Sequence, residues 1–142
     1  MAEHQSSIGI EAAPEVVFDF LVTDEGMTAW MGQYAALDAR PGGDFAVNIA
    51  GYAVRGRYLE IDRPRRVAFT WGMAGSDALP PGASVVTFTL SSIATGTRVD
   101  LSHTGLPDTE VAGHVRGWAH FLPRLGLASA GTMLGPDDWS PV

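Results

Sequence analysis

Two histidines and a tryptophan, His103, His114 and Trp118, lie on either side of a Pro-Asp pair near the end of the chain. A histidine can serve as a general acid or base because its unperturbed pKa is about 6.5. His103 is the catalytic candidate, but catalysis by the pair would also need a nucleophile or a substrate hydroxyl, which the sequence does not supply. A ligand contact, or a neutral imidazole hydrogen-bonded inside the fold, accounts for His103 equally well.

Other reactive arrangements are missing from the sequence. The four histidines, which include His4 and His120, show no metal-binding spacing, and the chain has no cysteine. There is no G-x-S-x-G motif to carry a nucleophilic serine, and the RPGGD segment at 40–44 lacks the Gly-Lys-Ser/Thr of a phosphate-binding loop. We therefore expect neither a metal nor a cofactor.

The charge balance limits the kinds of partner. The 142 residues, enough for one domain, carry 9 basic and 16 acidic side chains, for a net charge of −7. Nucleic acids and anionic membranes are polyanions, so this balance disfavours both. The first ten residues do not resemble a signal peptide, and no apolar stretch is long enough to insert into a bilayer, so we expect a cytoplasmic protein.

Apolar periodicity predicts the order of secondary structure. A first strand over 4–12 precedes two short helices, over 13–22 and 23–32. Six segments rich in β-branched and aromatic residues, separated by Gly- and Pro-containing turns, predict strands over 33–39, 45–50, 52–61, 67–72, 84–93 and 98–105.

An amphipathic pattern over 107–131 predicts a long final helix. We expect a kink at Pro123, because proline lacks a backbone donor and clashes with the preceding turn. His120 falls away from the apolar stripe, so we expect it to be exposed to solvent. The buried stripe is predicted to comprise Val111, Val115, Trp118, Leu122 and Leu125.

These elements predict an α+β fold in which the long helix crosses the concave side of a curled antiparallel sheet and leaves a cavity. In the last strand Val99, Leu101 and His103 share one face, so His103 points inward. His114 is expected nearby, because only a short turn joins this strand to the helix. The residues predicted to line the cavity are Trp30, Phe45, Tyr58, Phe69, Trp71, Phe88, His103, His114, Trp118, Phe121 and Leu122.

Three features outside this set could contribute to the site. Arg55 and Arg57 could meet an acidic ligand group at the cavity mouth, or pair with surface carboxylates instead. The segment 73–83 is longer than most hairpin loops, which predicts either a lid or contact surface or a solvated loop. In the tail over 128–142, Trp139 either docks back onto the domain or marks a contact surface.

Several stretches, taken in order, resemble one known family. They are IEAAPEVVFDFLVTDEGMTAWMG at 10–32, DARPGGDF at 38–45, GRYLEIDRPRRVAFTWG at 56–72, VTFTL at 86–90, TRVDLSHTGL at 97–106 and HVRGWAHFLPRL at 114–125. Over about residues 5–127 the chain resembles the START-like, helix-grip superfamily (SRPBCC), and within it the family of the activator of the heat-shock-protein-ninety ATPase.

The resemblance implies a single helix-grip domain over 1–142, with a curved antiparallel sheet of six or seven strands wrapped around a long C-terminal helix. It also implies a buried cavity that takes small apolar ligands, but it transfers no catalytic set to this chain.

The residues and the resemblance together favour a protein that binds a small apolar or aromatic molecule, oriented by His103, Tyr58 or Arg57. One alternative is an enzyme of the aromatase or polyketide-cyclase kind that uses His103 as its acid–base group. Another is a co-chaperone-like module that stimulates a partner ATPase. A homodimer is compatible with each, and the sequence leaves open both the ligand and whether any reaction is catalysed.

Overall fold

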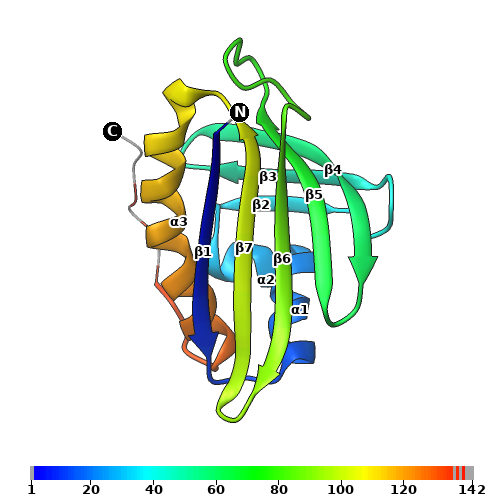
Figure 1. Cartoon of the computed structure of the whole chain (residues 1–142), viewed down its shortest axis with the longest axis vertical. Coiled ribbons are helices and arrows are strands. Elements are labelled where there is room, and N and C mark those ends of the chain that lie inside the picture. Colours follow the sequence, from blue (N-terminus) through cyan, green and yellow to red (C-terminus); the bar gives the residue numbers. More distant parts are fainter. Residues whose placement is uncertain (1, 136, 138, 140–142) are drawn as a thin grey trace.

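The computed structural model describes residues 2–135, 137 and 139, which form a seven-stranded antiparallel sheet and three helices (Figure 1). Strand β1 (Ala2–Ile10) leads into helices α1 (Pro14–Val22) and α2 (Asp24–Trp30). Six strands and a long helix follow: β2 (Tyr34–Leu37), β3 (Asp44–Ile49), β4 (Tyr52–Asp62), β5 (Arg66–Met73), β6 (Ser84–Ile93), β7 (Gly96–Leu106) and α3 (Asp108–Ser129). The predicted α+β fold and element order are confirmed.

The sheet has the strand order β1-β7-β6-β5-β4-β3-β2, so β2 to β7 form a meander and β1 pairs with the last strand. Ala50 and Gly51 connect β3 to β4 with φ angles of 50° and 88°, the left-handed conformation that a two-residue hairpin turn requires. The register places His103 between His4 of β1 and Val86 of β6. His103 therefore lies on a strand that is paired on both sides, next to the edge strand β1, and its side chain points to the inner face, where it is fully buried.

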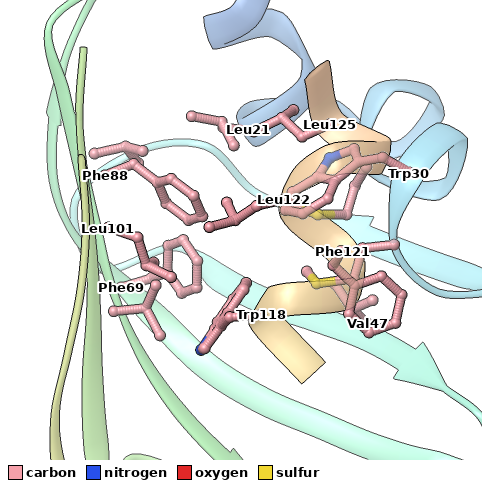
Figure 2. Packing of buried hydrophobic residues seen from close by; sticks show 14 of the residues in the cluster. Leu21, Trp30, Val47, Phe69, Phe88, Leu101, Trp118, Phe121, Leu122 and Leu125 are labelled. Atoms are coloured by element: carbon pink, nitrogen blue, oxygen red, sulfur yellow. The ribbon is translucent and has the colours of Figure 1, made fainter. Parts of the chain in front are cut away.

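Helix α3 covers the inner face of the sheet. Figure 2 shows Trp118, Leu122 and Leu125 of this helix directed towards the strands that carry Phe88 and Leu101. Trp30 of α2 is also fully buried and packs edge-on against Phe88, with ring centroids 6.3 Å apart, and its Nε1 donates a hydrogen bond to the Phe20 carbonyl oxygen at 2.9 Å. The core is thus a continuous apolar layer between sheet and helices.

The final helix continues as α-helix through Pro123 to Ser129, as far as the apolar pattern extends. It departs from the predicted buried stripe at one residue. Val115 is 37% exposed rather than buried. Its position on the helix lies roughly 90° from the centre of the buried face, which is set by Trp118, Phe121 and Leu125. The stripe is therefore confirmed for its C-terminal half and is wrong at Val115.

The segment between β5 and β6 packs against the domain. Leu79 is fully buried, and its backbone carbonyl accepts a hydrogen bond from the Met73 backbone N–H at 2.8 Å. The Pro80 carbonyl oxygen lies where a Cβ on Gly72 would be, only 1.8 Å away, so glycine is required there. Most of the other residues in the segment are exposed, so it is a solvated loop anchored to the core at Leu79.

Helices in the described part of the chain lack the length and apolar character needed to cross a membrane.

Candidate ligand-binding cleft

A cleft of about 430 Å³ opens between the N-terminal half of α3 and the adjoining ends of β3, β4 and β5. Its walls are mainly aromatic and apolar, with Ser76, Thr109, Glu110, His114 and Arg116 as the polar residues around it. The apolar side chains that form most of the wall are Met31, Tyr52, Trp71, Met73, Trp118 and Phe121. This lining matches the usual composition of small-molecule sites, in which a few polar groups accompany an apolar surface.

Two glycines of α3 leave the space for this cleft. Gly113 and Gly117 both line it and lie one helical turn apart, so they present backbone where other residues would present side chains. A Cβ at Gly113 would meet only the Arg116 guanidinium, at 3.8 Å. At Gly113 the cleft is therefore bordered only by the Arg116 guanidinium, whereas at Gly117 the Trp139 ring lies over the helix backbone.

His103 lies in the closed core and is held at both ring nitrogens. Trp118 Nε1 donates to His103 Nδ1 at 3.0 Å, so Nδ1 is an acceptor and the neutral ring carries its proton on Nε2. That Nε2 donates to Ser84 Oγ at 2.9 Å, and Ser84 Oγ in turn donates to the Trp71 carbonyl oxygen at 2.7 Å. Burial, together with the smaller effects of the His114 and His4 charges, lowers the pKa of His103 to about 3.

His114 forms the matching arrangement on the helix. Its Nε2 accepts a hydrogen bond from Trp71 Nε1 at 3.1 Å, and its Nδ1 donates to the Glu110 carbonyl oxygen at 2.7 Å. The His103 and His114 rings have centroids 5.2 Å apart, as the short connection between β7 and α3 predicts. Burial lowers the pKa of His114, against the opposing effects of the Glu110 carbonyl and carboxylate.

These contacts decide what the cleft offers to a ligand. The indole N–H groups of Trp71 and Trp118 both point to histidine nitrogens and are already bonded. What the two rings present to the cleft is carbon surface, with Trp71 4% and Trp118 3% exposed, so the wall favours apolar groups over groups that need a hydrogen-bond partner. His103 is shielded beneath Trp118 and has no exposed surface from which to exchange a proton with a ligand.

Comparison with known proteins places this architecture in a family. The sequence matches the family described as "Activator of Hsp90 ATPase homolog 1-like protein" over residues 11–128, most of its length. The chain belongs to this family. An AHSA1-like protein from Rhizobium etli is 37% identical, with 98% of this chain and 88% of that one covered and a TM-score of 0.77.

Two further members of the same structural group show the fold alone, because their sequences are less similar. The Aha1 dimer from Colwellia psychrerythraea is 21% identical, covers 92% of this chain and 98% of its own, and has a TM-score of 0.80. An HSP90 activator from Plasmodium falciparum is 20% identical, covers 89% of this chain and 94% of its own, and has a TM-score of 0.75. A comparison with curated proteins finds no match.

In this chain the predicted site residues fall into two groups. Trp71, His114, Trp118 and Phe121 line the cleft. The others pack in the closed core and are outside the cleft lining: Trp30, Phe45, Tyr58, Phe69, Phe88, His103 and Leu122. The core aromatics fill the space between sheet and helix, as in the stacked pair Phe45 and Phe69 with ring centroids 4.0 Å apart, so the open volume lies at one end only.

Sequence reasoning missed several lining residues of this family member. Ile49 and Val54 lie on the inward faces of β3 and β4. Strand alternation could have found them, because they lie two and four residues from the buried residues Val47 and Tyr58 and so share a face with them. Gly113 and Gly117 carry no periodic signal. Their contribution is an absence of side chain, which only the packing around them reveals.

Three further polar residues that were predicted to contact a ligand, Arg55, Arg57 and Tyr58, lie outside the cleft. Arg57 is exposed on the opposite face of the sheet, where it shares a shallow groove with Asp44 and Thr70. Arg55 lies on the same face and donates hydrogen bonds to the Asn48 side chain and the Val54 carbonyl. Tyr58 is fully buried and its hydroxyl donates to the Leu21 carbonyl oxygen at 3.1 Å. Burial and the negative charge of Asp24 raise the pKa of Tyr58.

We expect Tyr58→Phe to destabilise the protein by about 1–2 kcal/mol, since it removes the buried hydrogen bond to the Leu21 carbonyl. Tyr34, which is 51% exposed, provides the matched control, and Tyr34→Phe should change stability by less than about 0.5 kcal/mol. Urea unfolding followed by circular dichroism measures both. Equal effects would show that the Tyr58 hydroxyl does not stabilise the contact between β4 and α1.

Among the described residues, His, Asp and Glu side chains form no group that could hold a metal ion.

Proposed function

We propose that the protein binds a small, largely apolar molecule containing an aromatic ring in the cleft beside α3. The observation that carries this proposal is the wall formed by Trp71, Trp118 and Phe121, whose ring surfaces line an open volume of about 430 Å³. Small-molecule sites range from about 300 to 1,000 Å³, so the volume suits a ligand of modest size.

The internal hydrogen bonds support the same conclusion. A ligand that stacks on Trp71 or Trp118 leaves both indole N–H groups bonded to histidine and exposes no unsatisfied donor. The acid–base hypothesis for His103 draws no support from this geometry, because both ring nitrogens are occupied within the core. The co-chaperone-like hypothesis stays a prediction from the sequence.

We expect Gly113→Phe to lower the affinity for a neutral naphthalene dye such as prodan by about tenfold or more. The added ring would project into the cleft, where a Cβ meets only the Arg116 guanidinium. Replacing a helical glycine does not weaken the helix, so the variant should melt no lower than the natural protein. Dye emission measures affinity, and circular dichroism measures the melting temperature.

Gly113→Ala is the matched control. It changes the same position and stabilises the helix by about 1 kcal/mol, but it adds only one methyl group to the cleft. Dye binding should therefore survive in Gly113→Ala. Equal dye affinity in the phenylalanine and alanine variants, or no dye binding to the natural protein, would contradict the proposed function.

A further inference from the structure

The tail after α3 folds back on the same cleft. Trp139 lines the cleft, and its ring packs edge-on against Phe121 with centroids 5.1 Å apart. The Trp139 ring also stacks on the His120 ring, with centroids 5.8 Å apart and an angle of 22° between the ring planes. A Cβ on Gly117 would lie 3.6 Å from Trp139, so the glycine lets the indole sit directly on the helix backbone. The tail therefore places a flat aromatic ring at the cleft's edge.

The same tail also brings a carboxylate to a fixed position. Asp137 accepts a hydrogen bond from His120 Nε2 at 2.9 Å, and its second oxygen lies 3.9 Å from Arg124 Nε. Its side chain is only 10% exposed. His120 is thus a hydrogen-bond partner of Asp137 with 31% of its side chain exposed, so it is half-buried where the helix pattern predicts an exposed residue. Arg124 is itself held in place, because its Nε donates to the Trp30 carbonyl oxygen at 3.1 Å.

Ring and carboxylate are held at a short, defined separation. The Trp139 backbone nitrogen donates to Asp137 Oδ1 at 3.3 Å. Only Cα and Cβ separate that nitrogen from the indole ring. A linker of about three or four atoms would therefore span the distance from the ring to the carboxylate. The protein thus places an aromatic ring of its own, Trp139, in the cleft and a carboxylate, Asp137, beside it.

We propose that the cleft takes a small aromatic carboxylic acid, whose ring and carboxylate replace those of Trp139 and Asp137. The ring would lie on Phe121 and Gly117, and the carboxylate would accept a hydrogen bond from His120 and form an ion pair with Arg124, as Asp137 does. The fixed guanidinium of Arg124 supplies the positive charge, and the apolar wall of Trp71 and Trp118 accommodates the remainder of the ring system. This inference rests on the proposed function, because it names the ligand class of the same cleft.

The proposal also assigns a role to the tail. Trp139 and Asp137 already contact the residues that would bind the ligand. The tail therefore competes with the ligand and lowers the ligand's apparent affinity. The charged residues that line the cleft add no net charge that would repel an acid, because Glu110 and Arg116 contribute one charge of each sign. Removing the two tail side chains should therefore strengthen binding of the acid.

The test compares two probes that differ only in charge: indole-3-butyrate and its neutral amide, indole-3-butyramide. Calorimetric titration measures both with the natural full-length protein and with the double variant Asp137→Ala/Trp139→Ala. We expect the acid to bind the double variant about tenfold tighter than the natural protein, and about tenfold tighter than the amide binds the same variant. Adding His120→Gln to the double variant should lower the acid-to-amide affinity ratio.

The outcomes separate this inference from the proposed function. Equal affinities of acid and amide for the double variant would overturn the aromatic-acid assignment while leaving an aromatic site in place. Unchanged acid affinity after removal of the tail side chains would overturn the competition. If prodan binds but neither indole probe does, the ligand class is wrong; if no probe binds, the proposed function fails with it. A circular dichroism melt of each variant confirms that it is folded.

Discussion

Replacing His103 with alanine is expected to lower the free energy of unfolding by about 3–5 kcal/mol, the largest effect of any single change considered for this protein. The substitution would leave a cavity beneath Trp118 and remove the partners of two buried groups, Trp118 Nε1 and Ser84 Oγ. An indole N–H that points into a dry core has no water to replace the lost imidazole. Urea unfolding at pH 7.5, followed by circular dichroism, measures the loss.

His103→Gln is the conservative comparison. A glutamine side chain keeps one acceptor and one donor, which can face Trp118 and Ser84 as the imidazole nitrogens do, so part of the stability should return. The difference between the two variants isolates the hydrogen bonds from the loss of volume. An alanine variant that loses less than about 1 kcal/mol would show that Trp118 and Ser84 do not depend on His103.

Acidification is expected to destabilise the protein between about pH 6.5 and pH 3. The unfolded chain binds a proton at His103 below about pH 6.5, whereas the folded protein does so only near its pKa of about 3. In that window the unfolded state holds more protons, so the free energy of unfolding falls as the pH falls, by up to roughly 1.4 kcal/mol per pH unit. His114, whose pKa burial also lowers, adds to the slope. Urea unfolding at a series of pH values measures it.

The non-titrating variant His103→Gln separates this contribution from that of the 16 acidic residues. Stability should depend less steeply on pH in this variant than in the natural protein, and the difference should grow as the pH is lowered towards 3. Parallel pH profiles for the two proteins would mean that the His103 imidazole takes up its proton equally well in the folded and unfolded states.

Strand alternation and helical periodicity were sufficient to predict most of the fold. Alternation in β7 places His103 with Val99 and Leu101, and all three are buried on the inner face. The short link to α3 places His114 beside it. These predictions succeed because a strand has only two faces and a turn of few residues restricts where the next helix can begin.

The cleft was harder to predict, because aromatic residues favour both cores and binding sites. Phe45, Phe69 and Tyr58 pack against one another and close the middle of the cavity that periodicity alone left open. The open end depends instead on Gly113 and Gly117, and its rim depends on Trp139 folding back from the tail. Contacts between residues far apart in sequence determine all three, and no local pattern encodes them.

The four tryptophans of this chain occupy four distinguishable surroundings. Trp30 lies in the dry core against the Phe20 carbonyl, Trp71 and Trp118 each report on one of two different histidines, and Trp139 reports on the tail. Their intrinsic fluorescence can therefore be divided by region. Single-tryptophan versions of the protein, with phenylalanine at the other three positions, would follow core unfolding, imidazole protonation and tail release as separate optical signals from one chain.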